Sequence, residues 1–248
     1  MHIFDIHSHI LPAVDDGAKN LETSVRLLEM MKEQGITDVI ATPHFDANND
    51  NLDEFVLRVK TAYKTLASEI SGRNLPRVYI GSEVFYFPGI GKSQGIKALS
   101  LCNSEYLLME LPICRIDNII INDIVSLRRD LGIIPIIAHI ERYSRQRGFK
   151  KLLKLFEDGV ALAQVNTLSV VQKPYRRTVI KLIKKNYVTF VATDAHSVVN
   201  RPPLMDIALK EIEIKLGRVS KNQIIRNGCR LFDEIVGETE DLYDKQHA

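Results

Sequence analysis

The chain has 248 residues, of which 45% are hydrophobic and 26% are charged, with three cysteines and no tryptophan. This composition excludes collagen-like, intrinsically disordered and disulfide-scaffold proteins, and a chain of this length buries roughly three quarters of its unfolded surface. The formal net charge of +2 is too balanced to indicate a surface for nucleic acid or membrane.

The cellular compartment is predicted from three features that the sequence lacks: a signal peptide, a membrane span and paired cysteines. The N-terminal segment has no basic stretch followed by a long apolar run, so no signal peptide is expected, and no apolar run is long enough for a membrane span. The cysteines Cys102, Cys114 and Cys229 are far apart and form no Cys-x-x-Cys pair. We therefore expect a cytoplasmic protein with buried, reduced thiols.

Short β-branched apolar runs alternate along the chain with longer segments of helical period. The expected strands are 2–7, 37–42, 77–83, 105–110, 133–138, 160–166 and 187–193. The expected helices are 20–34, 52–70, 117–131, 148–158, 171–186 and 203–216, with a pair of short helices within 220–236. Asn20 is the expected N-cap of the first helix and Gly35 its C-cap. Segment 84–104 is expected as a long loop.

Repeated strand–helix alternation predicts a parallel α/β architecture, because each crossover between parallel strands needs a covering helix. No linker interrupts the chain, so we expect one domain over residues 1–236 and a polar, frayed tail over 237–248. Seven strands suit a barrel or an open doubly wound sheet. Both architectures place functional groups beyond the carboxyl ends of their strands.

Six of the seven expected strands end in His, Asp or Glu, and five of the seven histidines lie at these ends. His7 and His9 follow the first strand, while Asp194 and His196 follow the last. Residues i and i+2 of an extended chain project to one side, so each pair can hold one metal ion. The other strand ends carry His44, Glu83, Glu110 and His139.

A single polar residue at a strand end usually caps a helix or satisfies a loop. Loops do not usually concentrate their histidines at one rim, however, so the whole set indicates a multinuclear site for divalent Zn, Mn or Fe. The absence of a cysteine from the set favours Mn or Fe over structural Zn.

These residues belong to motifs that resemble a known family. The motifs are 7–17 (His-Ser-His-Ile-Leu-Pro-Ala-Val-Asp-Asp-Gly), 42–44 (Thr-Pro-His), Glu83, 138–143 (Ala-His-Ile-Glu-Arg-Tyr), 194–196 (Asp-Ala-His) and 201–203 (Arg-Pro-Pro). Together they resemble the PHP (polymerase and histidinol phosphatase) superfamily. More narrowly, about residues 1–235 are similar to bacterial manganese-dependent tyrosine-protein phosphatases of exopolysaccharide loci, the CpsB/YwqE type.

The resemblance implies a distorted seven-stranded parallel (β/α)7 TIM-like barrel, the PHP fold, with three metals at its C-terminal rim. One metal would bind His7, His9, Glu83 and Asp194. A second would share Glu83 and add Glu110 and His139. The third would bind Asp16, His44 and His196. Asp16 enters through the resemblance alone, because an acid in a loop before a helix is usually a cap.

The implied chemistry is hydrolysis of a phosphoric monoester. Clustered divalent ions lower the pKa of a bound water, and the resulting hydroxide can attack phosphorus. Arg142 and Arg201 follow His139 and His196 and are the expected donors to the phosphate oxygens, because the guanidinium fork matches phosphate. No cysteine is followed by five residues and an arginine, as in the cysteine-dependent tyrosine phosphatases, so tyrosine dephosphorylation would require the metals.

Three functions are weighed. The favoured one is dephosphorylation of protein tyrosine, with a bacterial tyrosine kinase of exopolysaccharide synthesis as the expected partner and manganese as the expected cofactor. The second is a small-molecule phosphatase of histidinol-phosphate type. Glu110 disfavours this function, because related enzymes more often have His at that position. The third is a nuclease or non-enzymatic role, which the absence of a continuous basic channel for DNA disfavours.

Two further features each have two interpretations. The aromatic tract 85–88 follows Glu83 and either lines the substrate mouth or packs a loop. Basic residues at helical spacing form solvated helix faces or dock an acidic or phosphorylated partner. These residues are Arg147, Lys150, Lys151, Lys154, Arg176, Arg177, Lys181, Lys184 and Lys185.

Overall fold

The computed structural model describes the backbone of residues 2–247 and the side chains of residues 2–236. All strands in this part of the chain pair in parallel. They are β1 (Phe4–Ser8), β2 (Asp38–Ala41), β3 (His44–Phe45), β4 (Arg77–Ile80), β5 (Glu83–Phe85), β6 (Tyr106–Glu110), β7 (Ile134–Ile137), β8 (Leu162–Asn166) and β9 (Phe190–Ala192). Each expected strand segment overlaps one of them, which confirms the parallel α/β class.

The helices alternate with these strands, as the sequence predicts. They are α1 (Leu21–Glu33), α2 (Leu52–Ile70), α3 (Asn118–Leu131), α4 (Phe149–Glu157), α5 (Thr167–Val171), α6 (Arg176–Lys184), α7 (Met205–Leu216) and α8 (Arg218–His247). The side chain of Asn20 accepts a hydrogen bond from the Thr23 N–H, and Gly35 has a φ of +82° just beyond α1. The expected N-cap is therefore confirmed, whereas the C-cap is Gln34 and Gly35 follows it.

The strands form two parallel sheets, of order β1-β2-β4 and β3-β5-β6-β7-β8-β9. The closed seven-stranded barrel implied by the resemblance is thus not seen as one continuous sheet. The second and third expected strands are interrupted after β2 and β4, where Pro43 has no N–H to donate to a ladder. The longer sheet is curled, and its last strand reaches β1: Asp194 N–H donates to His7 C=O at 2.8 Å, and Ser8 bridges Ala195.

Three predicted segments differ from the structure. The helix expected over 171–186 begins only at Arg176 of α6, after α5 has ended at Val171, because Pro174 cannot continue a helix. The pair of short helices within 220–236 is one helix, α8, since no proline interrupts it. Its backbone continues as helix to His247, through the segment expected to fray. The expected loop 84–104 contains β5 and three short 3-10 helices, Ile90–Lys92, Gln94–Leu99 and Leu101–Asn103.

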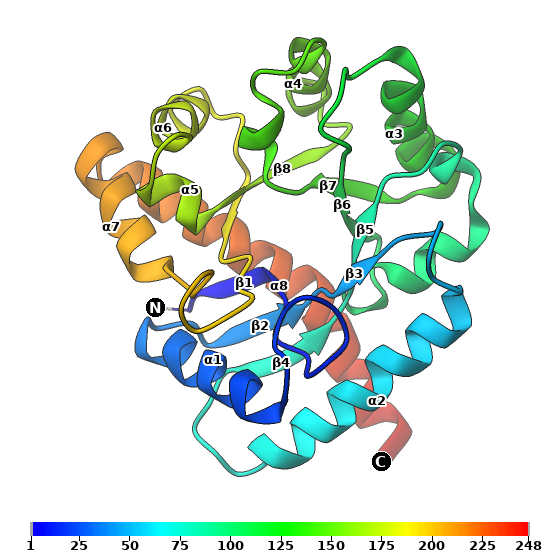
Figure 1. Cartoon of the computed structure of the whole chain (residues 1–248), viewed down its shortest axis with the longest axis vertical. Helices are drawn as coiled ribbons and strands as arrows, with labels where there is room; N and C mark the ends of the chain where they lie inside the picture. Colours follow the sequence, from blue (N-terminus) through cyan, green and yellow to red (C-terminus); the bar gives the residue numbers. More distant parts are fainter. Residues whose placement is uncertain (1, 248) are drawn as a thin grey trace.

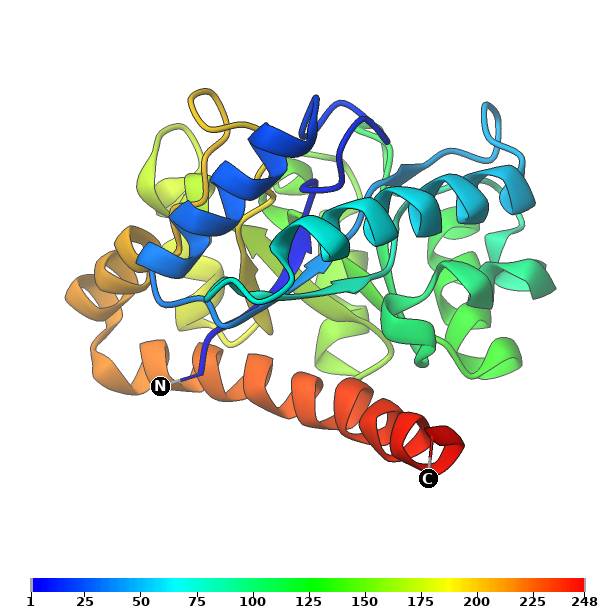
Figure 2. The same cartoon turned by 90° about the horizontal axis from the view of Figure 1, so that it is seen from below.

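Helices α1 to α7 surround the strands, and α8 crosses beneath them (Figure 1). In Figure 2, α8 lies on the side opposite the loop between β1 and α1, so it covers the amino ends of the strands. Inward-facing residues of several strands pack on it to form one apolar cluster. This cluster includes Phe4, Ile6, Ile40, Leu108, Ile136, Phe190, Leu231 and Ile235. Helix α8 and this apolar cluster therefore cover the amino ends of the strands, and the polar residues lie at the carboxyl ends.

The structure bears on the predicted burial of the three thiols and on the expected lack of a membrane span. Cys114 is exposed, and Cys102 and Cys229 are half-buried, so the prediction of three buried thiols is wrong; all three are free. Cys114 lies in the loop after β6, two residues beyond Pro112, and is not part of a strand. No helix in the described residues is both long and apolar enough to span a membrane.

Candidate metal centre

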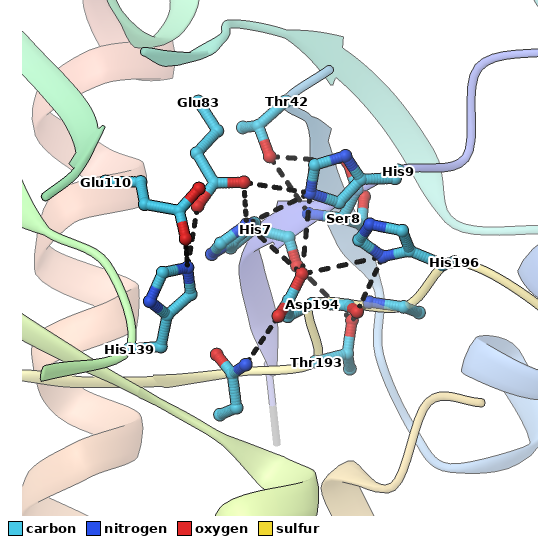
Figure 3. A network of polar contacts seen from close by, with 12 residues as sticks. His7, Ser8, His9, Thr42, Glu83, Glu110, His139, Thr193, Asp194 and His196 are labelled. Carbon is cyan, nitrogen blue, oxygen red and sulfur yellow. Dashed lines mark hydrogen bonds and ion pairs between the residues drawn. The ribbon is translucent and has the colours of Figure 1, made fainter. Parts of the chain in front are cut away.

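The nine side chains predicted as metal ligands come together beyond the carboxyl ends of the strands. Figure 3 labels all of them except Asp16 and His44. Eight of them make three groups whose nitrogen and oxygen atoms lie within 4.8 Å of one another. The groups are His7, His9, Glu83 and Asp194; His9, Asp16, His44 and His196; and His44, Glu83 and Glu110. The ninth, His139, has Nε2 2.8 Å from Glu83 Oε1 and 3.5 Å from Glu110 Oε1.

Glu83 is the side chain that joins these groups. Its Oε2 lies 3.1 Å from His7 Nε2, 3.2 Å from His9 Nε2 and 3.1 Å from His44 Nδ1. Its Oε1 is next to His139 instead. The two oxygens of one carboxylate therefore face four imidazoles, which is the arrangement of a ligand shared between metal ions.

Hydrogen bonds fix which nitrogen of three histidines faces the centre. The Nδ1 atoms of His7, His9 and His196 lie 3.2 Å from Gln164 Oε1, 2.7 Å from Asp15 Oδ2 and 3.0 Å from the Asp194 carbonyl oxygen. All three partners are acceptors, so we assign the proton to each Nδ1. Each Nε2 then presents its lone pair to the centre, as a metal-binding imidazole does.

The centre also contains buried atoms that no protein group satisfies. Glu83 Oε2, Asp194 Oδ1 and His196 Nε2 have no hydrogen-bond partner of acceptable geometry. His7 Nε2 and His9 Nε2 are only 3.1 Å apart. Such a gathering of acceptors and lone pairs is unfavourable unless cations lie among them. Imidazole nitrogens and carboxylate oxygens are donors suited to Mn, Fe or Zn, so the residues fit a divalent metal centre.

Charges in the centre shift the pKa values of its members. Burial opposes ionisation of Glu83 and Asp194, but the adjacent histidines hold the pKa of both carboxyls well below the usual range. Burial likewise opposes protonation of His7 and His9, yet the neighbouring carboxylates raise the pKa of both imidazoles. At His196, burial and the charge of His9 lower the pKa to about 3.

The local backbone turns these side chains toward one another. His139 and Asp194 have φ values of +35° and +51°, a left-handed conformation that is uncommon for residues other than glycine. Both residues stand just past the ends of β7 and β9. The register between β1 and β2 shifts between Asp5 and Ser8, and such irregularities re-aim side chains beside active sites. Two of the described non-glycine residues with a positive φ are thus predicted ligands.

The two predicted phosphate-binding arginines stand at the edge of the centre. Arg201 Nη2 lies 2.6 Å from Asp194 Oδ2, and Arg142 Nη2 lies 3.2 Å from the same oxygen. Arg142 Nη1 is also 3.2 Å from Glu110 Oε1. Both arginines are about one third exposed and line a cavity of about 240 Å³ together with Asn166, Tyr175, Thr193 and Pro202.

The grouping of ligands differs in detail from the one that the resemblance implies. His9 lies within reach of the group of Asp16, His44 and His196 as well as its own. His44 also reaches the pair of Glu83 and Glu110. The aromatic tract contributes nothing to this set: Tyr86 is buried and its hydroxyl donates to Asp123 at 2.8 Å, which supports loop packing.

Three residues that contact the ligands were not predicted. Asp15 accepts from His9, and Gln164 accepts from the His139 N–H at 2.9 Å as well as facing His7. Gln164 Nε2 donates to Asn166 Oδ1 at 2.9 Å, and Asn166 Nδ2 donates to Asp194 Oδ2 at 2.5 Å. Gln164 and Asn166 lie two residues apart in the buried strand β8. Two amides on one face of such a strand are the sequence signal that identifies them.

Residues 3–232 match the family described as capsular polysaccharide synthesis, CpsB/CapC. The chain belongs to this family. The CpsB/CapC membership confirms the resemblance to the CpsB/YwqE type that the motifs indicate.

Several relatives cover nearly the whole chain. The CapC protein of Staphylococcus aureus is 32% identical over 230 residues, which are 90% of this chain and 89% of that protein. The tyrosine-protein phosphatase CpsB of Streptococcus pneumoniae is 28% identical over 250 residues, 94% of this chain and 100% of that protein. The residues matched by the family, 3–232, span the predicted ligands from His7 to His196.

Solved structures agree with this membership. A structure from work on YwqE of Bacillus subtilis and CpsB of Streptococcus pneumoniae, described as unique metal-dependent tyrosine phosphatases, matches with a TM-score of 0.81. It is 27% identical, and the match covers 94% of each chain. Histidinol phosphate phosphatase of Lactococcus lactis matches with a TM-score of 0.52 at 11% identity, covering 87% of this chain and 95% of that one. The match to histidinol phosphate phosphatase shows a similar fold and nothing more.

Proposed function

We propose that this CpsB/CapC protein is a metal-dependent tyrosine-protein phosphatase. It hydrolyses the phosphoric monoester of tyrosine in a protein, and its substrate is a bacterial tyrosine kinase of exopolysaccharide synthesis. The observation that carries the proposal is the single cluster of nine histidine and carboxylate ligands with two arginines at its edge. Relatives named tyrosine-protein phosphatases align over most of the chain.

Three divalent ions, manganese by preference over zinc or iron, would be held by His7, His9, Asp16, His44, Glu83, Glu110, His139, Asp194 and His196. When bound, such ions supply Lewis acidity and bring the pKa of a coordinated water toward neutrality. The unsatisfied atoms Glu83 Oε2, Asp194 Oδ1 and His196 Nε2 support this assignment.

The chain's own residues bind and orient the phosphate. Arg142 and Arg201 present guanidinium groups to one cavity, where they stabilise charge on the phosphate oxygens as the transition state develops. Tyr175 and Pro202 line the same cavity and give a phenyl ring an apolar contact. A phenolate leaving group has an ordinary pKa of about 10, so it depends less on a general acid than an alkoxide does.

We further propose that the two sheets are parts of one distorted seven-stranded barrel in a single domain, residues 1–236. The ladder of β2 with β4 continues into that of β3 with β5, since Gly81 N–H donates to Ala41 C=O at 2.9 Å and Glu83 N–H to Pro43 C=O at 3.1 Å. The bridge of Ser8 to Ala195 supports closure. We place the protein in the cytoplasm, where its free thiols remain reduced.

The test supplies metal-free protein with Mn, Zn or Mg and compares hydrolysis of a phosphotyrosine peptide, a phosphoserine peptide and histidinol phosphate. We expect the phosphotyrosine peptide with Mn to be hydrolysed fastest. Preference for histidinol phosphate would overturn the substrate while leaving the metal centre in place. Activity that survives chelation, or the substitution His9→Ala, would overturn the mechanism.

A further inference from the structure

A second cavity adjoins the one that contains the two arginines. It has a volume of about 650 Å³ and is lined by Lys173, Pro174, Arg176, Arg177, Ile180 and Lys215, which we call the basic groove. Lys173 and Pro174 also line the cavity of Arg142 and Arg201, so the two cavities share a rim. A chain leaving the phosphate cavity across this rim enters the basic groove directly.

The basic groove is formed by the segment before α6, by α6 itself and by the end of α7. Helices α5, α6 and α7 lie side by side at the edge of the molecule (Figure 1). Lys173, Pro174, Arg177 and Lys215 are exposed, while Ile180 is half-buried. The groove therefore presents cationic groups around a small apolar floor, a surface that accepts both the charge and the backbone of an extended peptide.

The charge of the basic groove is only partly balanced. Glu211 lies 2.5 Å from Arg176 Nη2 and 4.0 Å from Lys215 Nζ. Among the side chains of residues 2–236, no acidic group forms an ion pair with Lys173 or Arg177. Four cations thus share one carboxylate here, although the whole chain carries a net charge of only +2. The basic groove therefore carries a local excess of positive charge.

We propose that the basic groove binds acidic residues that flank the phosphotyrosine of the protein substrate. The proposal rests on the proposed function, because it places the phosphorylated side chain between Arg142 and Arg201. An extended peptide advances about 3.3 Å per residue, so residues a few positions from the phosphotyrosine lie over the groove. Aspartate and glutamate complement its unpaired cations, and exposed charges of this kind govern encounter and selectivity.

Three substrates test the proposal with the manganese-loaded protein. They are a phosphotyrosine peptide with glutamates on both sides, the same peptide with serines in place of the glutamates, and p-nitrophenyl phosphate, which has no flanks. We expect KM to be about tenfold lower for the acidic peptide than for the serine peptide at low salt. The difference in KM between the two peptides should decrease as the salt concentration is raised toward about 0.5 M, because salt screens exposed charges. Equal KM values for the two peptides would overturn the proposal.

Charge reversal then locates the effect. In the double variant Arg177→Glu with Lys215→Glu, we expect KM for the acidic peptide to rise about tenfold while kcat remains near wild type. Hydrolysis of p-nitrophenyl phosphate should not change. The matched control is Lys181→Glu with Lys184→Glu, on the exposed side of α6 outside the groove, which changes the net charge equally. A similar rise in KM in the control would assign the effect to overall charge and overturn the proposal.

Binding provides a readout independent of turnover. Fluorescence anisotropy with the acidic peptide, its phosphotyrosine replaced by a non-hydrolysable phosphonate, should show about tenfold weaker binding to the Arg177→Glu/Lys215→Glu variant than to wild type. The milder Arg177→Ala/Lys215→Ala variant should show a smaller loss, and unchanged binding by both would overturn the proposal. If the wild-type protein hydrolyses neither phosphotyrosine peptide, the proposed function itself fails.

Discussion

Asp15 and Asp16 are adjacent in the sequence, yet their carboxylates contact different parts of the centre. The Asp15 side chain is 7% exposed, and its Oδ2 accepts from His9 Nδ1 at 2.7 Å and from the His44 N–H at 3.0 Å. The Asp16 side chain is 66% exposed, and its Oδ1 lies 3.3 Å from His196 Nε2. Asp15 therefore orients His9 and His44, whereas Asp16 places an oxygen beside His196, as expected of the ligand that we propose.

We expect Asp15→Ala to lower metal affinity about 10- to 100-fold, because His9 loses the acceptor that fixes its tautomer and ring orientation. Asp16→Ala should instead leave the protein with fewer bound ions. Elemental analysis after dialysis, together with metal titration of the apo-protein, separates the two outcomes. Asn at position 15 keeps an acceptor oxygen and should restore part of the affinity; unchanged affinity in Asp15→Ala would contradict the positioning role.

We expect Arg142→Ala and Arg201→Ala each to lower kcat/KM by about 100-fold, since each removes a preorganised donor to the phosphate oxygens. Metal content should remain near wild type, because the nine ligands are untouched. Arg145→Ala is the matched control, as Arg145 is exposed and does not line the phosphate cavity. Steady-state kinetics and elemental analysis on the same samples check this, and loss of metal would reassign both arginines as structural.

At the scale of elements, the centre depends on how the chain leaves each strand. The loop after β1 folds back on itself, and the Ala18 N–H donates to the His9 carbonyl at 2.9 Å. A Cβ atom on Gly17 would stand 2.2 Å from that same carbonyl oxygen. Glycine at this position therefore allows the close approach that brings Asp15 and Asp16 to the histidines.

Gly17→Ala should displace the loop and reduce metal content, because the added methyl group cannot fit without backbone movement. Gly159→Ala is the control: Gly159 has a φ of +68°, but nothing lies within 4 Å of an added Cβ. That control should lose about 1 kcal/mol of stability and keep its metals. Thermal unfolding and elemental analysis of both variants distinguish a local steric effect from general destabilisation, and full metal content in Gly17→Ala would contradict it.

Strands and most ligands could be predicted from the sequence because buried parallel strands are nearly all apolar, and a polar residue at their ends stands out. The division of the strands into two sheets could not be predicted, because the interruption near Pro43 depends on which strands pair. Asp16 required the resemblance, since its residue type is equally suited to a cap. Gln164 and Asp15 were missed because their roles lie in hydrogen bonds to histidines far away in the sequence or across a loop.

Across the whole molecule, the centre concentrates ionisable groups that respond to pH and metal together. The pKa values of His7 and His9 are raised above 6.5 in the fold, with carboxylates outweighing the opposing effect of burial. A histidine with a raised pKa stabilises the fold fully below pH 6.5, and this contribution is lost as the pH rises through its folded pKa. Metal ions require these imidazoles to be neutral, so protons and metals compete for them.

We therefore expect the difference in melting temperature between metal-loaded and chelator-treated protein to widen as the pH is raised from about 6.5 to about 8.5. The metal-free form loses the contribution of protonated His7 and His9, while the loaded form gains metal affinity. Calorimetric melting at a series of pH values checks this, and Mn titration in buffers of different ionisation enthalpy should show proton release. A difference that narrows with pH would contradict the assignment.

The ligand set also has a consequence for how the protein is made. His7 and His9 are synthesised well before their partners Asp194 and His196, which lie at the other end of the family-matched region, and Ser8 of β1 can bridge Ala195 only then. At about 5–20 residues per second, a ribosome needs on the order of 10–40 s to pass from one pair to the other. The nascent chain therefore cannot hold its full complement of ions, and insertion at the groups that include Asp194 or His196 must follow translation through β9.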